Sequence, residues 1–226
     1  MMRRTIFLSG WILVWIVFGA QAQKTVFRPE FAVGVSGGFN FASTSFSPKV
    51  LQGSLIAPNA GLTLRWLTEK NCGVQVELNY KQQGWSEKFE DPETSEPLGY
   101  NYSRKMSYIE IPFLTHVYFG QGKVNYFVNL GPQLGYLISE STDSNLDGDE
   151  PGNVNAQHTM EADKKFEWGL GGGPGIELRT GAGNFLLEGR FYYALSDFYN
   201  TRRKDYFSKA SSQVISVKLT YLFRVK

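Results

Sequence analysis

Several residue types and patterns that mark common classes of protein are scarce in this sequence of 226 residues. Cys72 is the only cysteine, which excludes an intrachain disulfide and a metal site built from several cysteines. After residue 22, no apolar run reaches the roughly 18 residues that a membrane-spanning helix needs. Neither sign of charge is in large excess, with 23 lysines and arginines against 21 aspartates and glutamates. Because nucleic-acid-binding domains are usually basic, we expect no nucleic-acid partner.

The N-terminus has the three parts of a secretory signal peptide. Arg3 and Arg4 supply positive charge, and 6–18 form a short apolar stretch. Ala20-Gln21-Ala22 then fits a small-residue cleavage site. We therefore predict a cleaved signal peptide at 1–22 and one exported domain at 23–226. A retained anchor helix is the alternative, but the apolar stretch is short and ends in the cleavage pattern.

The sequence contains a repeated segment with one apolar and one polar face. The 24 glycines of the whole chain argue against a helical protein, because glycine costs about 1 kcal/mol in a helix interior. In 185–195 the apolar side chains stand at alternate positions, and Glu188 and Arg190 lie between them. Successive side chains of a strand point to opposite faces, so this segment has one apolar and one charged face.

Eight such segments follow one another, and the connections between them alternate between long and short. The predicted strands are 31–41, 59–67, 73–85, 106–119, 124–137, 166–179, 185–195 and 212–223. The long connections are 42–57, 86–103, 138–165 and 196–211, and the turns are 68–72, 120–123 and 180–184. An even number of strands with short turns at one rim and long loops at the other is typical of outer-membrane barrels. We predict an all-β fold, an eight-stranded antiparallel up-and-down transmembrane β-barrel with both termini on the short-turn side.

Alternation alone leaves open a soluble, lipocalin-like barrel, whose apolar face points inward. Three features favour apolar side chains facing lipid. The polar face mixes charges of both signs, as a packed interior requires. It is also rich in glycine, which suits a narrow lumen. On the apolar face, aromatic residues gather near the strand ends, like the interfacial belts of membrane barrels. They are Phe31, Trp66, Phe119, Tyr126, Phe185, Tyr221 and Phe223 at the short-turn rim, and Tyr80, Tyr136, Trp168 and Tyr193 at the other.

Four segments resemble a known family. They are the first strand around 34–40, Tyr108-Ile-Glu-Ile-Pro-Phe-Leu114, Asn129-Leu-Gly-Pro-Gln-Leu-Gly135 and the glycine-rich 169–175. With them the mature chain resembles the PorT-like outer-membrane β-barrel proteins of Bacteroidota. The resemblance implies an outer-membrane location and an eight-stranded barrel. It does not supply a secretion role, because most members of the family have no assigned task.

One loop segment has the spacing of a calcium site. Asp143, Asn145, Asp147 and Asp149 place oxygen ligands at alternate positions, with glycine between the last two. Calcium loops use this spacing, although Val154 stands where their bidentate glutamate would be. A weak calcium site and a solvated acidic loop tip both remain open, and we expect no other cofactor.

The remaining candidates are two histidines and the charges of the polar face. His116 is predicted inside the barrel and His158 in a loop without a visible partner, so an enzyme acting on lipid is the weaker reading. The charged interior residues could line a conducting path or form a salt-bridge network. The interior of an eight-stranded barrel is just wide enough for side chains, which favours the network. The charged interior residues are Arg65, Glu77, Glu110, Glu188, Arg190 and Lys218.

We therefore expect a non-enzymatic outer-membrane barrel with a structural, loop-binding or envelope-assembly role, which is not a diffusion porin. The alternatives are a lipid-modifying enzyme and a soluble periplasmic carrier of an apolar ligand. Expected partners are outer-membrane lipid and lipopolysaccharide, whose phosphates Arg202-Arg203-Lys204 could meet, and an envelope protein of unknown identity.

Overall fold

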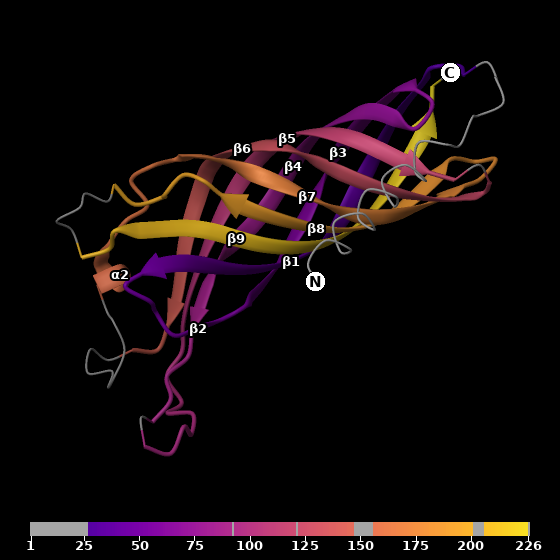
Figure 1. The fold of residues 1–226 in the computed structure, drawn as a ribbon. Helices are drawn as coiled ribbons and strands as arrows, with labels where there is room; N and C mark the ends of the chain where they lie inside the picture. The colour runs from indigo at the N-terminus through magenta and orange to yellow at the C-terminus, as the bar shows by residue number, and fades with distance from the viewer. Residues whose placement is uncertain (1–26, 92, 121, 147–155, 201–205, 226) are drawn as a thin grey trace, which may run out of the picture.

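The chain forms one antiparallel sheet that closes on itself (Figure 1). The computed structural model describes residues 27–91, 93–120, 122–146, 156–200 and 206–225. The strand order is β2-β4-β3-β1-β9-β8-β7-β6-β5, and β4 also pairs with β5, which completes the ring. The strands are β1 (Glu30–Ser47), β2 (Gln52–Gly53), β3 (Leu55–Glu69), β4 (Cys72–Glu87), β5 (Tyr102–Phe119), β6 (Val124–Ser144), β7 (Phe166–Arg179), β8 (Asn184–Ala194) and β9 (Lys209–Arg224). A four-residue helix, α2 (Ala156–Thr159), lies between β6 and β7.

β2 has only two residues, so eight long strands build the wall, as the alternation predicts. Each pairs antiparallel with its neighbours, and the first long strand, β1, pairs with the last, β9. The start of β1 and the end of β9 lie at the same rim, where the Val225 amide donates to the Phe31 carbonyl over 2.8 Å. This rim holds the short turns. The opposite rim, with the long connections, is termed the mouth below.

The predicted strand boundaries near the mouth are wrong. The predicted loop 42–57 is mostly strand, because β1 continues to Ser47 and β3 begins at Leu55. In the same way, β6 runs to Ser144, well into the predicted loop 138–165. Serine and threonine in these stretches weaken the apolar pattern but not the backbone pairing, since β1 stays in register with β9 as far as Ser47. Cys72 opens β4 instead of lying in the turn.

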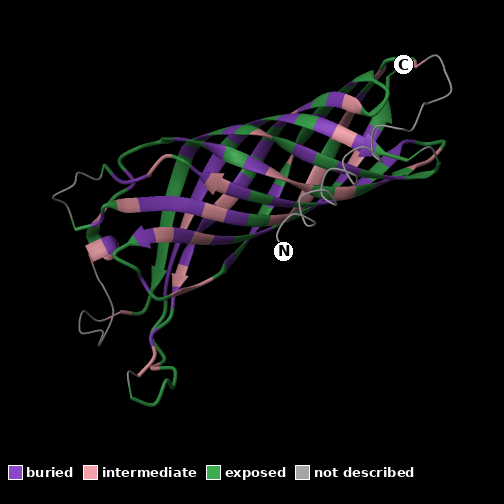
Figure 2. Ribbon diagram, in the orientation of Figure 1, coloured by how far each residue is buried: buried purple, intermediate pink, exposed green. Residues whose placement is uncertain are grey.

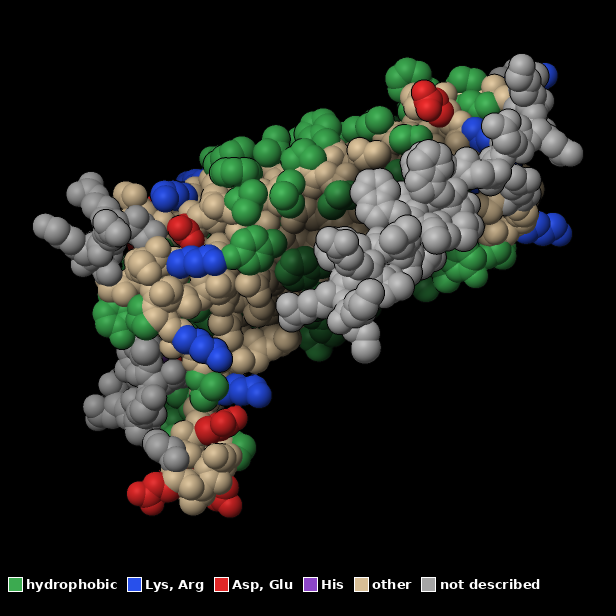
Figure 3. Space-filling model, in the orientation of Figure 1, with side chains coloured by type: hydrophobic (Ala, Val, Ile, Leu, Met, Phe, Trp, Pro, Cys, Tyr) green, Lys and Arg blue, Asp and Glu red, His purple; other side chains and the backbone are tan. Residues whose placement is uncertain are grey.

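The apolar face points outward, as predicted for a membrane barrel. Trp66, Leu187 and Val217 are 55%, 52% and 46% exposed, whereas Glu188 and Arg190 are 2% and 5% exposed. Exposed and buried residues alternate along most of the wall in Figure 2, and hydrophobic side chains form a broad band on the face that Figure 3 shows. The lipocalin-like alternative is therefore wrong, because it needs the reverse orientation. No described helix is long and apolar enough to cross a membrane.

Proline and glycine mark one irregular place in the wall. Between β7 and β8 the paired positions skip from Gly172–Phe191 to Gly175–Glu188. Pro174 lies in this gap and has no N–H to donate, which accounts for the interruption. On the inner side, the ring of Phe127 lies against Gly175, and only a residue without a side chain leaves room for that ring.

Candidate functional site

The middle of the barrel interior is held by a network of ion pairs. Arg190 on β8 reaches across the lumen to Glu77 on β4, with its Nη1 and Nη2 atoms 3.0 and 2.8 Å from the carboxylate oxygens. Lys218 on β9 lies 2.6 Å from the same carboxylate, and Glu188 pairs with Arg190 over 2.8 Å. The four side chains are almost fully buried, and each charge has an opposite partner.

A second layer lies closer to the mouth. Lys81 forms an ion pair with Glu110, and its Nζ atom stands 4.0 Å above the ring of Tyr192. Glu167 accepts hydrogen bonds from Gln83 and, over 2.6 Å, from Ser212. The predicted interior charges therefore form a salt-bridge network.

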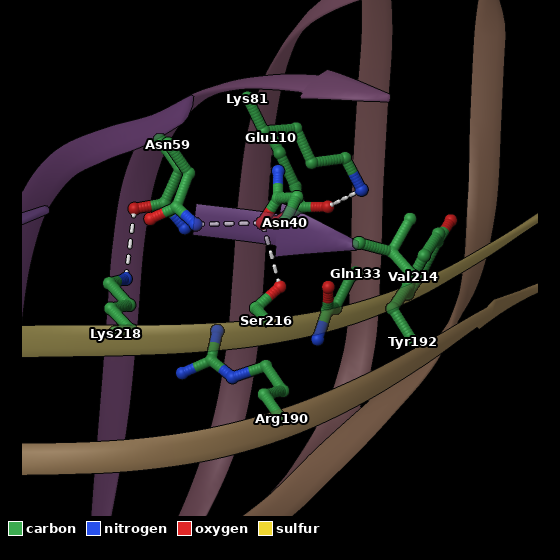
Figure 4. Close-up of a pocket in the computed structure, with 11 residues that line it drawn as sticks. Asn40, Asn59, Lys81, Glu110, Gln133, Arg190, Tyr192, Val214, Ser216 and Lys218 are labelled. Atoms are coloured by element: carbon green, nitrogen blue, oxygen red, sulfur yellow. Dashed lines mark hydrogen bonds and ion pairs between the residues drawn. The ribbon is translucent and has the colours of Figure 1, made fainter. Parts of the chain in front are cut away.

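Little free space remains between these two layers. Figure 4 shows the lining residues, with Asn40 between Asn59 and Ser216 and with Lys81 directed at Glu110. The cavity has a volume of about 20 Å³, enough for about one water molecule. The interior at this level is filled with side chains.

The short-turn end of the lumen has its own pair and its own apolar cluster. Arg65 and Glu177 lie 2.8 Å apart and are both fully buried. His116 lies inside, as predicted; its Nδ1 is 2.8 Å from the Asn129 Oδ1, and its ring packs 5.0 Å from that of Phe127. Around them, inward-pointing apolar side chains fill this end: Ala32, Leu67, Tyr118, Phe127, Leu186 and Leu222.

The mouth is filled by a larger aromatic group, which we term the mouth cluster. Its rings are in close contact, as Phe46 and Trp85 are 5.0 Å apart and Trp85 stacks on Phe198 at 5.9 Å. Burial also raises the pKa of the Tyr199 hydroxyl. The buried members of the cluster are Phe46, Val50, Trp85, Phe89, Tyr102, Met106, Tyr108, Leu137, Ala162, Phe198, Tyr199, Phe207 and Ala210. The mouth cluster joins strand ends to residues of the connections, which the sequence analysis predicts as loops. The aromatic residues inside those predicted loops are the feature of the sequence that indicates the cluster.

Helix α2 is fixed over the mouth cluster by buried charges. Arg104 of β5 donates to the backbone carbonyls of Gln157, over 3.0 Å, and of Met160, and it also pairs with Glu140. These bonds satisfy carbonyls at the end of a helix that would otherwise lack donors.

His158, on α2, has a partner that the sequence did not reveal. Its Nε2 atom lies 2.9 Å from the Glu87 carboxylate, and its ring lies 4.0 Å from that of Tyr102. Glu87 also accepts from Gln157 and from the indole of Trp85. The sequence shows no partner for His158, because Glu87 is distant in the chain and becomes a neighbour only when the barrel closes.

Among the described parts of the chain, the connection between β4 and β5 projects far from the mouth (Figure 1). It is a hairpin, in which Glu90 pairs with Pro97 and the Asp91 amide donates to the Glu96 carbonyl over 2.9 Å. The backbone amides of Thr94 and Glu93 hold the pKa of the Asp91 carboxyl below its usual value. The described residues of the tip are thus held by hydrogen bonds and form an acidic surface.

The predicted calcium ligands are only partly described. Asp143 belongs to β6 and pairs with Ser103, so it is not in a loop. The Asn145 side chain is held by the backbone of 99–101. Asp147 and Asp149 lie outside the described residues, as do Arg202-Arg203-Lys204 and the predicted signal peptide 1–22. Within the described ranges, no group of three or more His, Cys, Asp or Glu could hold a metal ion. The calcium site stays a prediction.

Comparison with solved structures finds several chains that align over most of their length at low sequence identity. The chain is similar to the Neisserial surface protein A, at 15% identity over 85% of this chain and 97% of that one, with a TM-score of 0.44. It is similar to the outer membrane protein OprG of Pseudomonas aeruginosa, at 14% over 86% and 95%, with a TM-score of 0.47. A major outer membrane protein of Thermus thermophilus is 10% identical over 88% of this chain and 100% of that one, with a TM-score of 0.49.

Comparison with curated protein sequences gives no match. The sequence pattern of one protein family, however, matches residues 20–200, which is most of the barrel. That family is described as the outer membrane protein beta-barrel domain. Together with the closed ring of strands and the outward apolar face, this match shows that the chain belongs to the outer membrane protein β-barrel domain family.

Proposed function

We propose that this protein is a non-enzymatic outer-membrane barrel that holds ordered outer loops in place for a binding partner and does not conduct solutes. The observation that carries the proposal is the mouth cluster. It buries strand ends and connection residues in one aromatic core, so that the loops rest on a fixed base. Preorganised loops bind with a smaller entropic cost than flexible ones.

The filled interior supports the non-conducting part of the proposal. Apolar clusters occupy both ends of the lumen, and paired charges occupy its middle. A water-filled channel needs a continuous path, and the cavity of about 20 Å³ between the charged layers offers none. Liposome swelling with small sugars tests this point. We expect no swelling above that of empty liposomes, and swelling that rises with the amount of protein would contradict it.

The surface that we assign to the partner is the β4–β5 hairpin tip. Replacing residues 91–96 with an Asn-Gly turn keeps the hairpin closed, because that pair favours the tight turn that joins two strands. In a pull-down from native membranes, the unaltered chain should retain an envelope protein that this variant loses. A matched variant with the 180–183 turn replaced, at the opposite rim, should retain it. Equal retention by all three chains would refute the assignment.

Export through a cleaved signal peptide at 1–22 and the finer relation to PorT-like barrels of Bacteroidota belong to the same proposal. They are supported by the N-terminal pattern and by the quoted segments.

A lipid-modifying enzyme is the second candidate, and the contacts of the two histidines disfavour it. His116 is fully buried against Asn129, and His158 contacts a carboxylate, an amide and a phenol ring. Such an enzyme needs a nucleophile beside its base. A lipid-release assay with His116→Ala and His158→Ala checks this. Turnover by the unaltered protein that one of these variants abolishes would restore the enzyme reading.

A further inference from the structure

A basic and aromatic hollow on the outer wall near the mouth is not used by the proposed loop function. Lys164 and Lys165 are exposed and directly precede β7. Below them lie Phe166, Trp168 and Leu195, each about half exposed on the lipid-facing side. These side chains line an open hollow of about 570 Å³, together with Ser196 and Asp197. The two lysines place cationic groups at one end of the hollow, and the apolar side chains of Phe166, Trp168 and Leu195, termed the apolar floor below, line the rest.

Backbone hydrogen bonds fix the shape of this hollow. The Lys164 amide donates to the Phe198 carbonyl over 3.1 Å, and the Lys165 carbonyl accepts from Leu137 over 2.7 Å. On the other side, the Leu195 amide donates to the Trp168 carbonyl over 2.9 Å. Both walls are therefore part of the barrel itself. No ion pair joins either lysine to a carboxylate within the described parts of the chain, so their ammonium groups are available to a ligand.

The two ends of the hollow lie at different heights along the barrel axis and therefore in different layers of a membrane. Trp168 belongs to the outward aromatic row near the mouth, and such rows lie at the interface between acyl chains and headgroups. A strand rises about 3.3 Å per residue and is tilted by roughly 40°. The two lysines then stand roughly 8–10 Å further out, at the level of lipid phosphates.

We propose that this hollow binds one phosphorylated glycolipid of the outer leaflet, such as the lipid anchor of lipopolysaccharide. One phosphate lies between Lys164 and Lys165, and an acyl chain runs along Phe166, Trp168 and Leu195. Two adjacent cations match the charge of a phosphate, and the apolar floor matches a chain but not a soluble phosphate compound. Asp197 adds a carboxylate at the headgroup level; its Oδ1 accepts from the Ala210 amide over 2.9 Å, and a sugar hydroxyl can donate to its other oxygen. A sugar headgroup offers more hydroxyl groups than the headgroup of a glycerophospholipid, and for this reason we choose a glycolipid as the ligand.

Native mass spectrometry of the full chain in detergent tests the site with three lipid probes. They are diphosphorylated lipid A, the same glycolipid without phosphates, and phosphatidylglycerol. We expect the unaltered chain to retain the phosphorylated glycolipid, and the double variant Lys164→Gln/Lys165→Gln to retain it roughly tenfold less or weaker still. The matched control, Lys70→Gln/Lys123→Gln at the opposite rim, should behave like the unaltered chain.

Each part of the proposal has an outcome that overturns it. Equal retention by the double lysine variant removes the phosphate site. Equal retention of the dephosphorylated glycolipid by the unaltered chain does the same and needs no variant to fold. Phosphatidylglycerol retained as well as lipid A overturns the choice of a glycolipid. Trp168→Ala should weaken the retention of both forms of lipid A. Unchanged retention would show that the acyl chain does not bind along Trp168.

Discussion

Arg190 and Glu77 form an ion pair across the whole width of the barrel. Arg190 stands on β8 and Glu77 on β4, and in the ring three strands separate these two in either direction. Both guanidinium Nη atoms lie within 3.0 Å of a Glu77 oxygen. A two-point contact between opposite walls fixes the lumen diameter as well as the charge balance. It also explains why the interior needs no apolar core at this level.

Replacing Glu77 should strongly destabilise the barrel. Glu77→Gln keeps the size of the side chain but removes its charge. Arg190 then keeps only the Glu188 carboxylate, and Lys218 loses the only carboxylate with which it forms an ion pair among the described residues. Breaking one partner of a buried pair costs about 3–5 kcal/mol in the free energy of unfolding. Urea unfolding of the protein in detergent micelles, followed by tryptophan fluorescence, measures this change.

The exposed Glu69, at the short-turn rim, provides the control. Glu69→Gln should change the free energy of unfolding by less than about 0.5 kcal/mol, as surface substitutions usually do. A double-mutant cycle with Arg190→Met should be strongly non-additive, because the two side chains act on each other. Additive effects would mean that the pair does not exist in the folded barrel.

A methyl group at Gly175 should clash with Phe127. A Cβ atom built on Gly175 lies 2.2 Å from the Cζ atom of that ring, which has no room to retreat inside the apolar cluster at this end. Gly175→Ala should therefore lower the free energy of unfolding by about 1–3 kcal/mol, the usual cost of overpacking.

The same clash predicts a rescue. Combining Gly175→Ala with Phe127→Leu shortens the opposing side chain, so the double variant should be more stable than the sum of the single changes implies. Gly181→Ala serves as the control, because nothing lies within 4 Å of a Cβ atom at that turn position. Urea unfolding checks all four proteins, and the absence of any coupling between the two sites would argue against the Phe127–Gly175 contact.

Removing Arg104 should loosen α2 without opening the barrel. The guanidinium holds the carbonyls of Gln157 and Met160, and hydrogen bonds to charged groups contribute about 1.5–3 kcal/mol. In Arg104→Met, amide hydrogen exchange over 156–163 should become roughly tenfold faster or more, while the strands keep their protection.

Lys105 is the natural comparison for that experiment. It is the next residue of β5 and has the opposite orientation in the strand, so Lys105→Met should leave exchange over 156–163 unchanged. Equal acceleration in both variants would show that α2 does not depend on the Arg104 contacts.

The wall of the barrel could be predicted from the sequence because alternation is a local property. The pattern predicts β7 at the bounds that the structure shows, because the inward Gly169, Gly171 and Gly173 and the outward Trp168 and Leu170 repeat with a period of two. Backbone pairing needs no particular side chain, so the serine-rich end of β1 was predicted as loop although it is strand.

The contacts of the mouth could not be predicted in this way. His158 and Glu87 are far apart in the chain, and so are Phe46 and Phe207, which pack with ring centroids 5.0 Å apart. Each pair meets only because the ring of strands closes, and closure brings together ends whose sequences show no mutual pattern. Aromatic residues in predicted loops are the one local sign of such a cluster.

The side-chain orientation is the central claim, and the tryptophans test it most directly. Trp66 and Trp168 point outward, whereas Trp85 is buried in the mouth cluster. Single-tryptophan variants of the chain that begins at Gln23, which lacks Trp11 and Trp15, can be refolded into bilayers whose acyl chains carry bromine, a contact quencher of indole fluorescence. We predict strong quenching of Trp66 and Trp168 and little quenching of Trp85. Quenching of Trp85 with Trp66 unaffected would contradict the account, because it would place the apolar face inside the barrel.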